Sequence, residues 1–221
     1  MISRRSFLAA LATTPVAACN TTRWGPHQND WASWYTGKTM PDKPHPIPLV
    51  DRSKLDPEYS PQIVPYRGTE SAGVIVVDID ERFLYLVQEK GRARRYGVGV
   101  GRQGFSWRGT AEVGRKAAWP DWVPTKTMVR LQPELARYAK GGLANPLGAR
   151  ALYLHQDGRD IMFRIHGTNE PWTIGQQVSS GCVRLLNEDI VDLYDRVPIG
   201  TVVFVRRKGQ HWVRRGRAAP A

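Results

Sequence analysis

Cys182 and His166 are the two side chains in this sequence best suited to nucleophilic chemistry. A free cysteine thiol has a pKa of about 8.5 and is mostly protonated at neutral pH, so a nucleophilic cysteine needs a base or a positively charged neighbour. His166 is a candidate for the base and Arg184 for the positive charge. The segment therefore predicts covalent catalysis by an activated thiol, and we expect Cys182 to be alkylated at a lower pH than an ordinary thiol.

The element that positions His166 is expected to be a strand. Residues 161–165 are mostly apolar, which is typical of a strand, and His166 follows them directly. Gly167 then lets the backbone turn sharply, because a residue without a Cβ adopts conformations closed to other residues. The imidazole is predicted to lie at the end of a strand and to face a cleft.

The segment before the cysteine is expected to hold the backbone close to a substrate. Gly181 permits a positive φ and a close approach, since it has no side chain. The backbone amides of Ser180, Gly181 and Cys182 are then candidates for an oxyanion hole, in which N–H groups stabilise the negative charge of a tetrahedral intermediate.

The sequence His-Gly-Thr-Asn at 166–169, followed by Ser-x-Gly-Cys-Val-Arg-Leu at 179–185, resembles the catalytic domain of the L,D-transpeptidases, the YkuD-like family of bacterial cell-wall enzymes. The resemblance covers roughly residues 73–206. It implies a cysteine acyltransferase that attacks a peptidoglycan tetrapeptide stem after its third residue and releases D-alanine. The acyl group would pass to an amine of another stem or of an envelope protein, with no metal and no organic cofactor.

The same resemblance assigns roles to the residues of the motif. It implies that Cys182 is the nucleophile, that His166 is its base, and that the carbonyl of Gly167 orients this base. Many members of the family have a histidine immediately before the Gly-Cys pair, where this chain has Ser180. Any role of that second histidine is therefore not expected in this chain.

Arg184, Thr168 and Asn169 are the candidates for substrate binding. The planar guanidinium of an arginine suits a carboxylate, and stem peptides end in one. A structural ion pair is the alternative role for Arg184.

The composition favours a mainly β domain. At 221 residues the chain can hold one domain of ordinary size with extensions, and its 16 prolines and 21 glycines indicate many turns and short strands. The family resemblance adds a curved sheet or sandwich with two short helices at residues 73–206. Strands are expected at 74–80, 83–88, 97–101, 152–155, 161–166 and 202–205, and helices at 133–140 and 187–197, the second capped by Asn187.

The N-terminus is typical of an exported protein. In residues 1–18 the pair Arg4 and Arg5 precedes an apolar run that is too short to span a bilayer permanently. The paired arginines resemble a twin-arginine signal, with ordinary secretion as the alternative. The sequence Val-Ala-Ala-Cys ending at Cys19 resembles a lipoprotein processing box, so Cys19 is a candidate for lipidation, with ordinary cleavage nearby as the alternative. Both alternatives place the mature domain in the periplasm.

Two extensions are expected to flank the catalytic domain. Residues 19–72 form a proline-rich leader whose tryptophans are expected to pack on the domain, and residues 207–221 form a basic tail. The formal net charge of +12 is compatible with nucleic acid, an anionic membrane surface or an acidic polymer as partner. No nucleic-acid-binding module is recognisable and the chain is predicted to be exported, so we expect no nucleic acid and possible membrane contact only through a lipid anchor.

Two cofactor interpretations have little support in the sequence. Gly99, Gly101 and Gly104 form a nominal G-x-G-x-x-G, but a dinucleotide site needs a helix to begin there and the following residues show no helical pattern. A zinc centre built from His155, His166 and Cys182 lacks the paired ligand spacing of known zinc sites. With only two cysteines, the chain also has no disulfide framework.

Two other functions remain open from the sequence. The same Cys–His pair would serve an L,D-carboxypeptidase or endopeptidase, in which water replaces the acceptor amine. A lipid-tethered, non-catalytic module that binds the cell envelope is the alternative from a different class.

Overall fold

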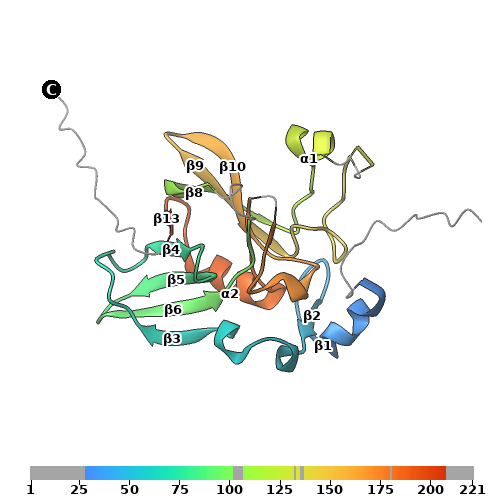
Figure 1. The fold of residues 1–221 in the computed structure, drawn as a ribbon, viewed down its shortest axis with the longest axis horizontal. Coiled ribbons are helices and arrows are strands. Elements are labelled where there is room, and N and C mark those ends of the chain that lie inside the picture. The colour runs from blue at the N-terminus through green and yellow to red at the C-terminus, as the bar shows by residue number, and fades with distance from the viewer. Residues whose placement is uncertain (1–27, 102–106, 132, 135–136, 180, 208–221) are drawn as a thin grey trace, which may run out of the picture.

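The computed structural model describes residues 28–101, 107–131, 133–134, 137–179 and 181–207 and confirms a mainly β protein with two α-helices in that part of the chain (Figure 1). The strands are β1 (Tyr35–Met40), β2 (Ile47–Val50), β3 (Gln62–Pro65), β4 (Ile75–Asp78), β5 (Phe83–Gln88), β6 (Arg92–Gly97), β7 (Val100–Gly101), β8 (Gly109–Ala118), β9 (Arg150–Gln156), β10 (Arg159–His166), β11 (Gln177–Ser179), β12 (Val183–Arg184) and β13 (Val202–Arg206). The α-helices are α1 (Lys126–Leu131) and α2 (Asn187–Arg196), and the short 3-10 helices are η1 (Gln28–Trp34), η2 (Arg52–Lys54), η3 (Pro57–Tyr59) and η4 (Pro171–Thr173).

A nine-stranded mixed sheet is the main element, in the order β12-β10-β9-β8-β13-β4-β5-β6-β3. The pairs β10–β12 and β13–β4 are parallel, and the remaining neighbours are antiparallel. The strands β8 to β10 and the strands β3 to β6 run in different directions in Figure 1, so the sheet is bent. The site described below lies at the β12 edge of this sheet.

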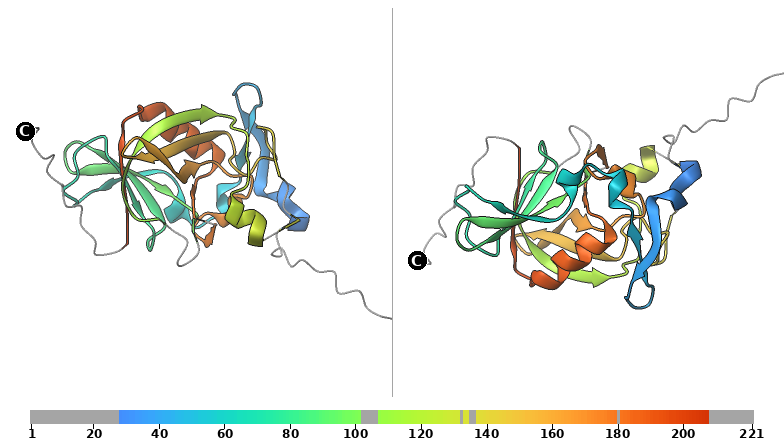
Figure 2. Two further views of the ribbon diagram at one scale, coloured as in Figure 1. Left: turned by 90° about the horizontal axis from the view of Figure 1, so that it is seen from above. Right: turned by 90° about the horizontal axis from the view of Figure 1, so that it is seen from below.

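The hydrophobic core joins both ends of the bent sheet to helix α2. Fully buried side chains from β4 and β5 belong to one cluster with those of β9, β10 and α2. Helix α2 packs against β9, as Figure 2 also shows, and Ile190 and Leu193 are its buried apolar residues. At the other end of the sheet, Tyr96 on β6 donates to Asp192 on α2. The helix thereby fixes the curvature of the sheet beneath the site.

The predicted hairpin and the C-terminal strand are confirmed, and the first helix is not. Strands β4 and β5 pair within residues 74–88, and β13 covers the predicted 202–205. The helix expected at 133–140 is wrong, because Ala139 pairs with Trp122 in a β-bridge and Pro133 is part of a turn. The helix α1 precedes Pro133, since a proline cannot continue a helix.

The cap predicted for the second helix is also wrong. Helix α2 is present, but Leu186 occupies the N-cap position and no side chain caps the helix. Asn187 is the first helical residue, and its side chain forms hydrogen bonds to other segments of the chain.

The segment expected to be a leader is folded onto the domain from residue 28 onward. Strands β1 and β2 form a hairpin, and β3 is the edge strand of the main sheet, so the sheet begins before residue 73. Val50 packs with Ile174 and Leu186, and Trp34 lies partly buried against the same cluster. The prediction that tryptophans of this segment pack on the domain therefore holds for Trp34.

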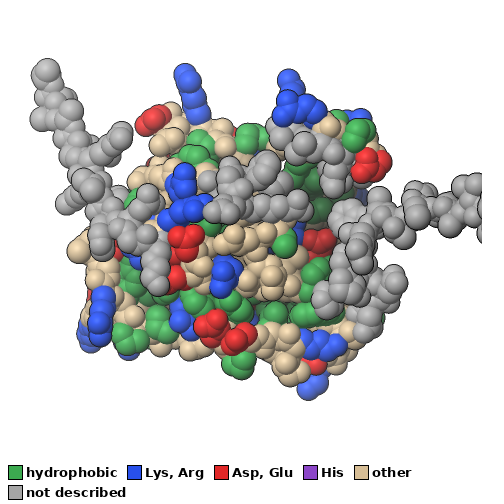
Figure 3. Space-filling model, in the orientation of Figure 1, with side chains coloured by type: hydrophobic (Ala, Val, Ile, Leu, Met, Phe, Trp, Pro, Cys, Tyr) green, Lys and Arg blue, Asp and Glu red, His purple; other side chains and the backbone are tan. Residues whose placement is uncertain are grey.

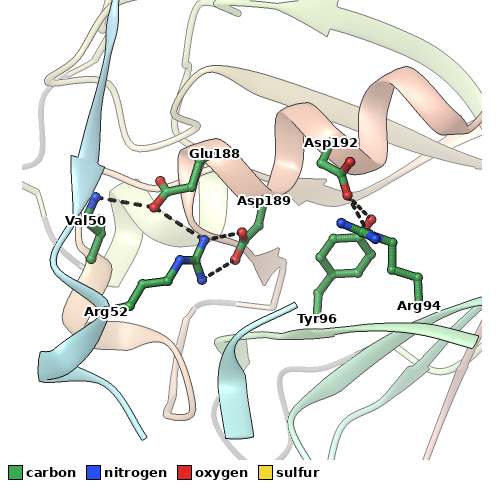
Figure 4. Close-up of polar contacts among 7 residues, drawn as sticks. All are labelled: Val50, Arg52, Arg94, Tyr96, Glu188, Asp189 and Asp192. Carbon is green, nitrogen blue, oxygen red and sulfur yellow. Dashed lines mark hydrogen bonds and ion pairs between the residues drawn. The ribbon is translucent and has the colours of Figure 1, made fainter. Parts of the chain in front are cut away.

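Arg52 links this N-terminal segment to the start of helix α2 (Figure 4). Its guanidinium donates two hydrogen bonds to the carboxylate of Asp189 and one to Glu188, which also accepts from the amide of Val50. Burial raises the pKa of Asp189 to about 7, although the charge and hydrogen bonds of Arg52 oppose this shift. The carboxyl is therefore neutral in the folded protein at pH 5 and ionised at pH 8.

Replacing Arg52 with methionine should destabilise the protein more at pH 8 than at pH 5. At pH 8 the buried carboxylate of Asp189 would lose its partner, whereas at pH 5 it is protonated and needs none. We expect a loss on the order of 2 kcal/mol at pH 8, below that of a fully buried pair because Arg52 is partly exposed. Thermal unfolding at both pH values measures it, with the exposed Arg67→Met as control. An equal loss at both pH values would contradict the ionic role.

Several predicted features lie outside the described residues. These are the export signal at 1–18, Cys19, Gly104, Ser180 and all of the basic tail except residue 207. Within the described part of the chain, no helix is long and apolar enough to cross a membrane. On the face drawn in Figure 3, Lys and Arg side chains alternate with Asp and Glu, and its described residues show no continuous basic stripe.

Candidate active site

The parallel pairing of β10 with β12 brings His166 and Cys182 together. Ile165 is level with Val183 and His166 is level with Arg184, so Cys182, one residue before Val183, is next to Arg164. Ile165 and Val183 are buried in the core. Because side chains alternate between the two faces of a strand, Arg164 and His166 lie on the other face of β10.

Cys182 is a partly buried thiol at the entry to β12 and is not part of a disulfide. Gly181 before it has φ of +140°, a conformation that favours glycine, as predicted from the sequence. Burial raises the pKa of the Cys182 thiol, whereas a hydrogen bond from the amide of Arg164 and the charges of Arg164 and Arg184 lower it. The balance raises the pKa, so the thiol is protonated at neutral pH in the resting protein, whereas the sequence led us to expect an activated thiol.

His166 is held in one orientation by the residue that follows it. The imidazole is buried, and its Nδ1 lies 2.5 Å from the carbonyl oxygen of Gly167. Since a carbonyl only accepts, Nδ1 carries the proton and Nε2 is left unprotonated. Burial lowers the pKa of His166 to about 3, with a further contribution from the charge of Arg184. The imidazole is thus neutral at pH 7 and able to accept a proton at Nε2.

Thr168 and Asn169 shape the loop that follows His166. Thr168 is buried, and its hydroxyl accepts from the amide of Glu170. The side-chain amide of Asn169 donates to the carbonyl of Ala144 at 3.0 Å. Both residues follow the predicted base directly in the chain. Their side chains bond to groups of the protein, Thr168 to the amide of Glu170 and Asn169 to the carbonyl of Ala144.

Arg184 has a carboxylate partner within the chain. Its Nη1 donates to Oε2 of Glu170 at 2.5 Å, and its backbone forms a β-bridge with Gly99. Both side chains of this ion pair are partly exposed. Because Glu170 lies in the segment between His166 and Cys182, the ion pair holds the Arg184 side chain against this segment.

Arg164 is a cation of the site that the sequence analysis did not identify. Both of its terminal nitrogens donate to the carboxylate of Asp160, at 2.7 and 2.9 Å, and its guanidinium lies 4.4 Å from the ring centre of Tyr153. A register shift in β10 between Asp160 and Arg164, with Met162 at φ +59°, accompanies this arrangement. The sequence could have indicated this position, because residues two apart in a strand lie on the same face, and Arg164 is two positions before His166.

The two cofactor interpretations find no suitable geometry in the described residues. His155 is level with Asp160 and His166 with Ala151, so the two histidines are four residues of β9 apart, about 13 Å along the β9–β10 hairpin. No group of three or more His, Cys, Asp or Glu side chains in the described chain is arranged to hold a metal ion. Gly99 and Gly101 lie at strand β7, and the next described element is strand β8, not the helix that a dinucleotide site requires.

The bent mixed sheet thus carries a thiol at the entry to β12 and an oriented, neutral imidazole at the end of the neighbouring strand β10. A family model described as the L,D-transpeptidase catalytic domain (YkuD) matches residues 72–205. This range is more than half of the chain, and the chain belongs to that family.

Relatives of known name agree with the family. The probable L,D-transpeptidase YbiS of Escherichia coli K12 is 37% identical over 151 residues, which are 65% of this chain and 47% of that protein. The probable L,D-transpeptidase ErfK/SrfK of the same strain is 34% identical over 153 residues, 66% of this chain and 47% of that protein. The chain spans about half the length of these relatives.

A solved structure covers a similar part of the chain. The protein is from Brucella melitensis and is described as a probable carnitine operon oxidoreductase. It is 46% identical, and the match covers 68% of this chain and 96% of that one with a TM-score of 0.47.

Proposed function

We propose that this protein is a peptidoglycan L,D-transpeptidase in which Cys182 is the nucleophile and His166 the base. The observation that supports this most directly is the hydrogen bond from Nδ1 of His166 to the carbonyl of Gly167, next to the strand that carries Cys182. It leaves Nε2 free to accept the thiol proton. Membership of the L,D-transpeptidase family supplies the substrate class.

In the first half-reaction, Nε2 of His166 accepts the proton of Cys182 as the sulfur attacks the carbonyl carbon of the third residue of a tetrapeptide stem. The backbone amides of Ser180, Gly181 and Cys182 are the proposed donors to the resulting oxyanion. The proton then passes from His166 to the leaving nitrogen, the peptide bond breaks, and D-alanine leaves. A thioester on Cys182 remains.

In the second half-reaction, an amine of another stem or of an envelope protein attacks the thioester. His166 accepts a proton from this amine and returns it to the sulfur as Cys182 leaves, so the enzyme is regenerated and an amide bond forms. If water attacks instead, the product is a tripeptide and the enzyme is a carboxypeptidase. The neutral imidazole suits both steps, because Nε2 is unprotonated at pH 7 and its lone pair is available for proton transfer during the reaction.

Analysis of wall products tests this proposal. The purified chain would be incubated with peptidoglycan, and the digested products identified by mass spectrometry. Cross-links between third residues of two stems are expected. Tripeptides alone would instead support the carboxypeptidase, a protein remnant on the stem would identify an envelope acceptor, and unchanged wall material with every acceptor would support the non-catalytic binding module.

Arg184, Thr168 and Asn169 are proposed to bind the stem peptide, with Arg184 directed at a carboxylate. Arg184→Lys keeps the charge and loses the planar pair of donors, so turnover should fall by roughly tenfold or more while the protein stays folded. Steady-state kinetics and thermal unfolding measure the two effects.

Glu170→Gln is the matched control for this prediction, because it removes the carboxylate that Arg184 contacts within the chain. If Arg184 serves the substrate, this variant should retain turnover. Equal losses of stability and turnover in the Arg184→Lys and Glu170→Gln variants would identify the ion pair as structural only.

We also propose that the protein is exported to the periplasm and anchored there through a lipid on Cys19. The arginine pair and the processing box in the sequence support this. In cell fractionation, Cys19→Ala should move the mature protein from the membrane to the soluble periplasmic fraction. Unchanged membrane association would refute the anchor.

A further inference from the structure

The position of the Gly167 carbonyl determines the tautomer of His166, so the backbone at residues 167–168 must be fixed. Gly167 donates its amide to the carbonyl of Arg150, which holds one side of this turn. The other side needs a second attachment, because a peptide free to rotate would turn the carbonyl away from Nδ1. The side chain of Asn187 makes that attachment.

The amide of Asn187 bridges two segments that are distant in sequence. Its Nδ2 donates to the carbonyl of Thr168 at 3.0 Å, and its Oδ1 accepts from the amide of Ala149 at 2.9 Å. The side chain is buried, with 6% of the residue exposed. Both bonds are therefore shielded from water. Loss of either would leave a buried polar group without a partner, which is costly.

Two glycines leave the space that this side chain occupies. A Cβ on Gly167 would lie 2.2 Å from Oδ1 of Asn187, and a Cβ on Gly148 would lie 2.1 Å from the same oxygen. Gly148 also has φ of +61° and approaches the amide of Thr168. The backbone on both sides is thus fitted closely around the Asn187 amide.

Asn187 also lies three residues beyond the end of β12, the short strand that follows Cys182. Strand β12 ends at Arg184, and the amide of Leu185 donates to the carbonyl of His166 at 2.8 Å before helix α2 begins at Asn187. The bond from Asn187 to Thr168 therefore joins the segment that follows β12 to the segment that follows His166 at the end of β10.

We propose that Asn187 is a positioning residue: by holding the carbonyl of Thr168 it fixes the backbone that follows the Gly167–Thr168 peptide, as Arg150 fixes the backbone that precedes it, so that His166 keeps its proton on Nδ1 and presents Nε2 to Cys182. The catalytic consequence rests on the proposed function. The tautomer itself is a property of the folded chain and is measurable without turnover.

The test uses the full chain with ¹⁵N-labelled histidine, and His166→Gln assigns the signals of His166. In the wild type, the ¹⁵N chemical shifts should show a protonated Nδ1 and an unprotonated Nε2. Asn187→Asp keeps an oxygen for the amide of Ala149 and places another oxygen against the carbonyl of Thr168, so the two tautomers should become mixed. Turnover of a stem peptide should fall by roughly tenfold or more. Asn187→Ala, which removes the bond without repulsion, is the second variant if the aspartate variant does not fold.

Lys116→Met is the matched control, because Lys116 anchors the other end of helix α2 through the carbonyls of Tyr194 and Val197. It should lower thermal stability and leave the His166 spectrum unchanged. If the Asn187 variants keep a single Nδ1–H tautomer, or lose turnover only in proportion to stability as the Lys116 variant does, the positioning role is refuted. The expected spectra in a chain without any transpeptidation would support the positioning role and refute the proposed function.

Discussion

Cys182→Ala is expected to abolish turnover, with a loss of about 10⁴-fold or more, because no other group can form the thioester. The alanine side chain is smaller than the thiol that it replaces, so the protein should remain folded. Family resemblance adds that a carbapenem, which imitates an acyl donor, should add its mass to the intact wild-type chain. Mass spectrometry after incubation with a carbapenem measures the adduct, and thermal unfolding confirms the fold.

The control for this experiment is the other cysteine. Cys19→Ala in the same chain should form the same adduct at the same rate, since Cys19 lies far from the His-Gly-Thr-Asn and Ser-x-Gly-Cys motif in the sequence. A Cys182→Ala protein that still forms an adduct or cross-links stems would overturn the proposed mechanism. Loss of the adduct together with loss of the folded state would call for Cys182→Ser, which retains a polar atom at this position.

His166→Asn is expected to reduce turnover by about 10²-fold to about 10⁴-fold, which is the usual range for loss of a general base. Asparagine has a side-chain amide that can still donate to the carbonyl of Gly167, in place of Nδ1. It cannot accept the thiol proton. The loss therefore reports the base itself rather than the local packing, and steady-state kinetics measure it.

The pH profile gives a second measure of His166. Because the folded pKa of the imidazole is lowered to about 3, it stays neutral far below the pKa of an ordinary histidine, about 6.5. The wild-type rate should therefore not fall as the pH decreases from 8 to about 5. An acid limb near pH 6.5 would contradict the buried, neutral base.

Alkylation of the resting thiol should follow the burial of Cys182. The sequence alone suggested that alkylation persists below the pKa of an ordinary thiol, with His166 as the cause. In the structure, burial raises the pKa of Cys182, so reaction with iodoacetamide should require a higher pH than a free thiol does. The base then acts during attack on the substrate, and not by forming a stable ion pair beforehand.

The sequence by itself was sufficient to name Cys182 and His166 as the candidate nucleophile and base, because both are marked by local patterns. The apolar run before His166 predicts a strand, and the glycines at 167 and 181 mark sharp backbone turns. The hairpin at 74–88 and the strand at 202–205 were likewise predictable, since runs of branched and aromatic residues and the turn residues beside them are local features of the sequence. These patterns do not say which strands pair.

The tertiary structure alone decided how distant segments meet. The parallel pairing of β10 with β12 places Cys182 beside Arg164. This strand register depends on packing in the core. Residues 28–72 lack a local periodicity, but they fold onto helix α2 through Arg52 and Val50 because α2 offers them a buried surface and two carboxylates.

The same physical reason explains the wrong helix at 133–140 and the wrong cap of helix α2. Pro133 was a plausible first residue of a helix, but pairing between Trp122 and Ala139 holds that segment in another conformation. Asn187 has a typical capping side chain, yet it bonds instead to the amide of Ala149 and the carbonyl of Thr168, which lie within its reach only in the folded chain. A capping side chain stabilises a helix by about 1 kcal/mol. Two buried hydrogen bonds between distant segments can contribute more than this, so they decide the conformation of the side chain.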